Sequence, residues 1–195
     1  MELPKKYKHL DIEAKWAQNW SDTGVYDWNS ATTRDKTFAV DTPPPTVSGS
    51  LHIGHVFSYT HTDAIARYQR MRGKNVFYPM GWDDNGLPTE RRVQNVFGIK
   101  CDPKAITPAN FQLSESHKKK PHQYDAVSRE TFINACAQLT TKDEAVFEGL
   151  WRKLGLSVDW SLQYATIDDH CRKTSQISFL DLVKKNKVKN TTSPG

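Results

Sequence analysis

The most constraining feature of the chain is a short buried strand that leads directly into a proline- and glycine-rich turn and then a long helix. Residues 37–42 (TFAVDT) are apolar enough to predict a buried strand. The three prolines at 43–45 end this strand, because proline cannot donate to a sheet ladder. A Ser-Gly-Ser stretch at 48–50 then precedes the helix. This order is typical of a ligand-binding turn in an α/β fold.

The helix after the turn is predicted from a stripe with a spacing of three or four residues. Gly73 stands where the glycine that ends a helix is expected, and residues 75–78 (NVFY) indicate the next strand. Strand, helix and strand form a βαβ unit, which implies parallel pairing. We therefore predict an α/β fold that contains the first half of a Rossmann-like nucleotide-binding sheet, followed by helices and incomplete. The stripe that we expect to pack on the sheet is Ile53, Val56, Phe57, Thr60, Ala64, Tyr68 and Met71.

Composition excludes several classes of protein. Of the 195 residues, 37% are hydrophobic and 25% are charged, which is ordinary for a folded chain and not for a disordered one. The net charge of +5 is compatible with a nucleic-acid partner, but charge alone favours the simpler explanation, solubility. No apolar run is long enough for a membrane helix, and the first residues lack an apolar signal core, so we expect a cytoplasmic protein with no membrane partner. The three cysteines are far apart, and no metal site is predicted.

The rest of the chain divides by composition. A polar, proline-containing segment predicts an exposed insertion, and helical periodicity resumes after it. Within that last helical part, Thr141 and Glu144 have the spacing of a capping box, and Gly155 closes the stripe that follows. The predicted organisation is an N-terminal helical segment at 1–36, the first half of the nucleotide-binding domain at 37–99, the insertion at 100–125, a helical continuation at 126–187 and a tail at 188–195.

The turn before the helix carries the candidate chemistry. Its sequence, SGSLHIGH, has neither the GxGxxG of dinucleotide binders nor the lysine of a P-loop. It places His52 and His55 on one face of the first helical turn, with Gly54 between them. Imidazoles at a helix N-terminus can donate hydrogen bonds to phosphate oxygens, and Gly54 leaves room for a flat ring or a ribose. A lone His pair at this spacing is usually structural, but its place after a strand and a turn favours phosphate binding.

These residues carry a resemblance to a known family. The stretch DTPPPTVSGSLHIGH is similar to the region around the HIGH motif of class I aminoacyl-tRNA synthetases, and GWDDNGLPTE at 81–90 is similar to a second element of the same family. The residues of both stretches are typical of the subgroup of synthetases specific for valine, isoleucine or leucine. GWDDNGLPTERRVQ resembles the valine-specific members most. The resemblance continues over nearly the whole chain.

The resemblance implies that the chain uses ATP, with Mg²⁺, to activate valine, which is then joined to tRNA(Val). His52 and His55 would contact the phosphates, and Gly54 would lie under the adenine. Asp83 would hold the ammonium of the amino acid. Pro44 and Thr46 would line the amino-acid pocket, although Thr46 stands where asparagine is common. The residues that form the context of the motif are Pro45, Val47, Ser48, Gly49, Ser50, Leu51 and Ile53.

Two neighbouring carboxylates have alternative roles. A buried ammonium needs a carboxylate partner, and Asp83 and Asp84 follow a predicted strand end where such a partner belongs. Asp84 is equally well explained as a solvated turn residue. Glu90 either starts the next helix as a favourable charge near its N-terminus, which we favour, or helps to shape the pocket.

Other parts of the family pattern are not found in the sequence. It has no KMSKS-like lysine loop, and no editing or anticodon-binding region. We therefore expect an N-terminal catalytic fragment, with a C-terminal half missing and with full activity requiring residues outside it. The alternatives are an inactive fragment or a module that binds a nucleotide or a partner chain, and a fragment specific for isoleucine.

Overall fold

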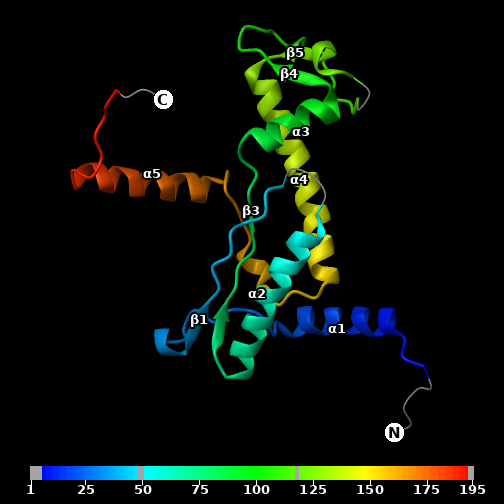
Figure 1. Cartoon of the computed structure of the whole chain (residues 1–195), viewed down its shortest axis with the longest axis vertical. Helices are drawn as coiled ribbons and strands as arrows, with labels where there is room; N and C mark the ends of the chain where they lie inside the picture. The colour runs from blue at the N-terminus through cyan, green and yellow to red at the C-terminus, as the bar shows by residue number, and fades with distance from the viewer. Residues whose placement is uncertain (1–5, 48–50, 117–118, 193–195) are drawn as a thin grey trace.

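The computed structural model describes residues 6–47, 51–116 and 119–192. In Figure 1 the chain forms an elongated body in which α2 and α4 follow the long axis. The helices are α1 (His9–Thr23), η1 (Arg34–Lys36), α2 (Ile53–Met71), α3 (Leu87–Phe97), η2 (Pro121–Gln123), α4 (Arg129–Lys153), η3 (Trp160–Leu162) and α5 (Asp169–Lys184). The strands are β1 (Thr37–Ala39), β2 (Asn75–Phe77), β3 (Gly81–Trp82), β4 (Ile99–Cys101), β5 (Asp125–Val127) and β6 (Tyr164–Ala165).

The predicted βαβ unit is present. Strands β1 and β2 pair in parallel, with Phe38 opposite Val76, and α2 connects them. β1 is shorter than the predicted 37–42, but the N–H of Val40 still donates to the carbonyl of Phe77 at 2.8 Å. Pairs β3–β6 and β4–β5 are also parallel, and Thr46 forms an isolated parallel bridge with Asp83. The mixed α/β fold with parallel strands is therefore confirmed, as short pairs in the part of the chain that is described.

The predicted packing face of α2 is wrong except at Val56, which is partly buried against the core. The helix begins at Ile53 and ends at Met71 as predicted, but these two side chains are each 80% exposed. The residues that α2 buries are Tyr59, Asp63 and Ala66. Asp63 can be buried because its carboxylate accepts hydrogen bonds from the backbone and hydroxyl of Ser157, both at 2.6 Å, and from Arg67. A stripe defined by apolar residues alone misses a face that contains a satisfied carboxylate.

The longest helix, α4, starts earlier than the capping-box spacing of Thr141 and Glu144 predicted. α4 begins at Arg129, where the hydroxyl of Ser128 accepts from the N–H of Thr131, and it continues without a break to Lys153. Thr141 is therefore not a cap, and its hydroxyl donates to the carbonyl of Ala137 inside the helix. The region predicted as a helical continuation also contains β6 and η3. Segment 100–125 begins within β4 and ends where β5 starts, so both of its ends belong to paired strands.

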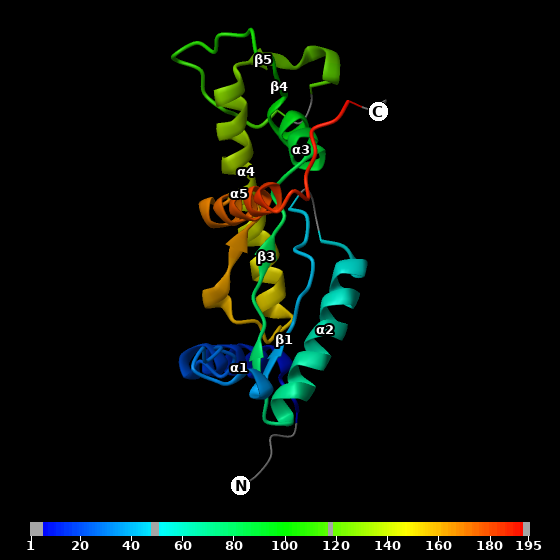
Figure 2. The ribbon, with the colours of Figure 1, turned by 90° about the vertical axis from the view of Figure 1, so that its left-hand side faces the viewer.

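Two hydrophobic cores lie one above the other along α4 (Figures 1 and 2). The first core packs β1, β2, β3 and α2 against the C-terminal half of α4 and comprises Val40, Val47, Tyr59, Ala66, Val76, Tyr78, Met80, Trp82, Phe147, Trp151, Leu156 and Val158. The second core packs α3, β4 and β5 against its N-terminal half and comprises Val93, Val96, Phe97, Ile99, Val127, Phe132, Ala135 and Leu139. One helix thus supports both halves of the body.

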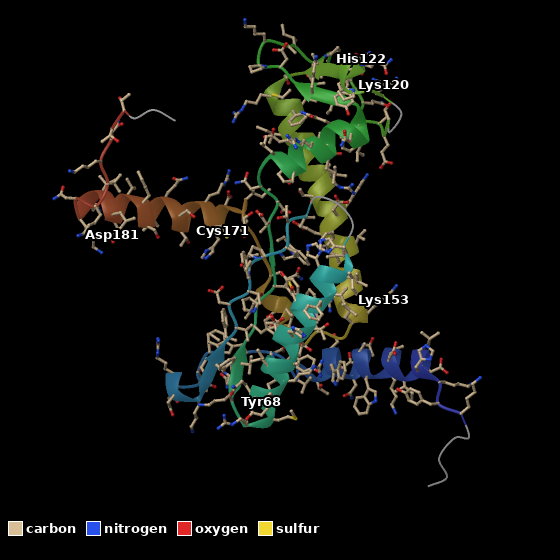
Figure 3. The ribbon with its side chains drawn as sticks, in the orientation of Figure 1. Tyr68, Lys120, His122, Lys153, Cys171 and Asp181 are labelled. Carbon is tan, nitrogen blue, oxygen red and sulfur yellow. The ribbon has the colours of Figure 1, made fainter. Side chains whose placement is uncertain are left out.

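The two terminal helices lie outside these cores. Neither α1 nor α5 buries a residue. α5 projects sideways from the body, as Figure 3 shows from the labelled Cys171 near its start to Asp181 near its end. Within the described ranges, no helix is both long and apolar enough to cross a membrane.

Candidate active site

A cavity of about 580 Å³ lies between the proline turn and the first turns of α2. It is lined by residues of the 42–46 turn and by His52, Gly54, His55, Ser58, Tyr59 and Thr62. The hydroxyl of Tyr59 donates to the carbonyl of Pro43 at 2.7 Å and fixes the turn against the helix. The structure therefore brings together six residues that the sequence singled out, which are Pro44, Pro45, Thr46, His52, Gly54 and His55.

The two histidines form the N-terminal cap of α2. The Nδ1 atom of His52 accepts from the N–H of Gly54 at 3.1 Å, and Nδ1 of His55 accepts from the N–H of His52 at 3.3 Å. A neutral imidazole that accepts at Nδ1 carries its proton on Nε2. The ring centres are 4.0 Å apart, and burial together with the nearby His52 lowers the pKa of His55. The cap therefore leaves two Nε2–H donors at the positive end of the helix dipole.

Gly54 is required by the cap itself. A Cβ atom at this position would lie 2.9 Å from both Nδ1 and Cε1 of the His52 ring. Any other residue would push that ring out of its place and disturb the bond from the Gly54 N–H. The glycine between the histidines thus allows the helix end to accommodate a ring folded back over it.

Asp83 is connected to the wall of the cavity. It follows β3, it is half-buried, and its Oδ2 accepts from the hydroxyl of Thr46 at 3.1 Å. Its Oδ1 accepts from the hydroxyl of Thr166 at 3.3 Å, and its backbone N–H donates to the carbonyl of Pro45. No sequence pattern pointed to Thr166 as a neighbour of the site, because its only visible signal was its place before a helix.

Asp84 is not a solvated turn residue. Only 5% of it is exposed, and its side chain is hydrogen-bonded to that of Glu144 on α4. Burial, followed by this bond, raises the pKa of Glu144 to about 8, and burial also raises the pKa of Asp84. Near neutral pH the pair therefore holds a proton between its two carboxyl groups. Glu90, by contrast, lies in the first turn of α3, where its charge favours the helix N-terminus as we preferred.

The remaining residues of the motif context differ in their burial. Val47 is buried in the first core, Leu51 packs against that core and Ile53 faces outward. Ser48, Gly49 and Ser50 lie outside the described residues. Among the described residues, no group of three or more His, Cys, Asp or Glu could hold a metal ion.

The parallel α/β fold is the one expected of the class I aminoacyl-tRNA synthetases that the sequence resembles. The comparison with known families agrees with this class. Residues 15–194 match the family described as tRNA synthetases class I (I, L, M and V), so the chain belongs to that family. A solved structure with a similar fold is a LeuRS from Agrobacterium radiobacter K84, in a ternary complex described as LeuRS-tRNA-LeuAMS. It has a TM-score of 0.67 and 28% sequence identity, and the match covers 93% of this chain and 18% of that one.

Within this family, the similar curated relatives are valine–tRNA ligases. The chain is 58% identical to the valine–tRNA ligase of Thermobifida fusca, over 91% of this chain and 20% of the relative. It is 50% identical to the valine–tRNA ligase of Leifsonia xyli, over 98% of this chain and 23% of the relative. The chain therefore spans about a fifth of the length of the curated relatives that it matches.

Proposed function

We propose that this chain is the ATP-binding part of a valine–tRNA ligase and that its cavity takes part in forming valyl-adenylate from valine and ATP. One observation carries the proposal. The capped histidines and the proline turn line one cavity, and the turn is hydrogen-bonded through Thr46 to the carboxylate of Asp83. Donors suited to phosphate thus line the cavity, and a carboxylate suited to an ammonium lies directly behind its lining residue Thr46.

In the proposed reaction, a carboxylate oxygen of valine attacks the α-phosphorus of ATP. The new P–O bond forms as the bond to the leaving oxygen breaks, and pyrophosphate departs with the electron pair. Negative charge grows on phosphate oxygens during this step, and the Nε2–H groups of His52 and His55 are the donors that stabilise it. Both rings are already fixed by their Nδ1 bonds, so little reorganisation is needed. The Mg²⁺ that accompanies ATP enters as part of the substrate.

The other proposed roles are those that the resemblance to the family implies. Asp83 binds the α-ammonium of valine, and Pro44 and Thr46 form the wall beside the amino acid. Gly54 lies under the adenine. Transfer of the valyl group to tRNA(Val) takes place in the cytoplasm and requires the full-length enzyme. This chain corresponds to about a fifth of the length of such enzymes. The 195-residue sequence contains no KMSKS-like loop to neutralise the pyrophosphate.

The experiment is valine-dependent exchange of pyrophosphate into ATP by the purified chain, with ATP binding measured in parallel by calorimetry. We expect weak ATP binding and slow exchange, and His52→Ala and His55→Ala should each lower exchange by about 10²–10³-fold, the cost of losing one transition-state donor. Isoleucine tested beside valine checks specificity. A chain that binds no ATP and catalyses no exchange would contradict the proposal and leave only an inactive fragment or a partner-binding module.

A further inference from the structure

The carboxylate of Asp83 is held from two sides by threonines that come from different parts of the chain. Thr46 donates to one oxygen at 3.1 Å and Thr166 donates to the other at 3.3 Å. Thr46 belongs to the proline turn, whereas Thr166 follows β6, 83 residues after Asp83. Each oxygen thus uses one lone-pair site on a hydroxyl and keeps another for a ligand.

The backbone fixes Thr166 in this place. Strand β6 pairs in parallel with β3, and the N–H of Thr166 donates to the carbonyl of Trp82 at 2.9 Å. Asp168 closes the turn that follows, because its carboxylate accepts from the N–H of Ala165 and caps α5. Thr166 and Asp83 therefore stand side by side at the carboxyl ends of two paired strands, where α/β folds bind their ligands.

The direction of the hydrogen bonds at Thr166 is determined. The backbone N–H of Asp84 donates to its Oγ1 at 3.3 Å. The hydroxyl has a single hydrogen of its own, and that hydrogen is directed to Oδ1 of Asp83. A side chain that both accepts from one residue and donates to the next cannot rotate freely without breaking one of the two bonds.

We infer that Thr166 is a positioning residue, which orients the Asp83 carboxylate toward the ammonium group of the amino acid. The inference rests on the proposed function. Thr166 does not touch the substrate, and it acts only through Asp83. Its removal should therefore weaken ligands that carry an ammonium and spare those that do not.

The test compares Thr166→Val, which keeps the shape and removes the hydroxyl, with Thr166→Ser, which retains it. Two ligands are titrated into each chain: valine and 2-hydroxy-3-methylbutanoate, in which a hydroxyl replaces the ammonium. We expect Thr166→Val to raise the Kd for valine by about tenfold, roughly the value of one hydrogen bond to a charged group, and to leave the Kd of the hydroxy acid unchanged. Thr166→Ser should restore valine binding, and Thr174→Val, at an exposed threonine of α5, is the matched control.

An equal loss for both ligands would show a general structural effect and overturn the inference. A second measurement needs no ligand: the ¹³Cγ resonance of Asp83 should move in Thr166→Val and return in Thr166→Ser. An unchanged resonance overturns the inference whatever the titrations give. If the unaltered chain binds no valine while the resonance moves as expected, the proposed function fails and the orientation of Asp83 by Thr166 stands.

Discussion

The two cores along α4 are held together in different ways. The first core is crossed by polar groups: the buried carboxylate of Asp63 joins α2 to Ser157, and Asp159 accepts from the N–H of Trp28 across the chain at 2.8 Å. The second core is a cluster of aliphatic and aromatic side chains, and its clearest polar link is the ion pair between Arg92 and Asp143 beside it. The half that carries the candidate site thus adds buried directional bonds to its packing, whereas the second core is held mainly by packing.

The first core should be the more sensitive to loss of a single polar group. Asp63→Ala leaves the N–H and the hydroxyl of Ser157 without their acceptor and removes the ion pair of Arg67, and we expect a loss of about 3–5 kcal/mol in the free energy of unfolding. Urea denaturation measures this. Asp169→Ala is the control, because Asp169 pairs with Arg172 on the exposed face of α5, and it should change stability by no more than about 0.5 kcal/mol. Equal losses in the two variants would remove the distinction between directional and packing support.

Loss of side-chain volume in the second core should lower the free energy of unfolding, and it should loosen only the elements around that core. Leu139 is 5% exposed, and Leu139→Ala should cost about 2–5 kcal/mol through lost burial and the cavity that remains. Hydrogen exchange should become faster in α3 and β4, which pack on this part of α4, while the amides of α2 keep their protection. Faster exchange throughout α2 as well would mean that the two cores open as one unit.

The junction between the cores should make stability depend on pH. Asp84 precedes α3 and Glu144 lies on α4 between the two cores, and the pKa of Glu144 is raised to about 8. A carboxyl group whose pKa is higher in the folded state binds more protons there than in the unfolded chain. Its contribution is therefore complete below pH about 4.5 and is lost as the pH rises through about 8.

Glu144→Gln should remove most of this slope, since the amide stays neutral and can still donate to Asp84. The midpoint of urea unfolding measured from pH 5 to 9 checks it, with Glu13→Gln on the exposed side of α1 as the control that keeps the slope. A slope that survives in Glu144→Gln would place its origin elsewhere.

The sequence predicted the first core better than the second. The βαβ unit, both ends of α2 and the turn with the two histidines were all visible because they are local patterns of spacing, proline and glycine. The burial of Asp63 was not, since its partner Ser157 is 94 positions away and a carboxylate carries no apolar signal. Strands β4 and β5 each expose two of their three residues, and so their segment was read as polar and exposed.

The candidate site divides in the same way. Residues 44–55 are close in sequence, and their association followed from one motif. Asp84 was ambiguous because a carboxyl group is buried here only with the help of Glu144, which lies 60 positions further on a helix whose start had been misplaced. Thr166 was missed because its role depends on the pairing of two strands of two residues each.

The three prolines at 43–45 give the cavity an electrical polarity. None of them has an amide hydrogen, so the backbone of these three residues can only accept hydrogen bonds, and the carbonyls of Pro43 and Pro45 already accept from the hydroxyl of Tyr59 and the N–H of Asp83. The opposite wall, at the start of α2, presents imidazole donors and the positive end of a helix. A molecule with a cationic and an anionic end is therefore favoured in one orientation, with its anionic end toward the start of α2 and its cationic end toward the proline wall.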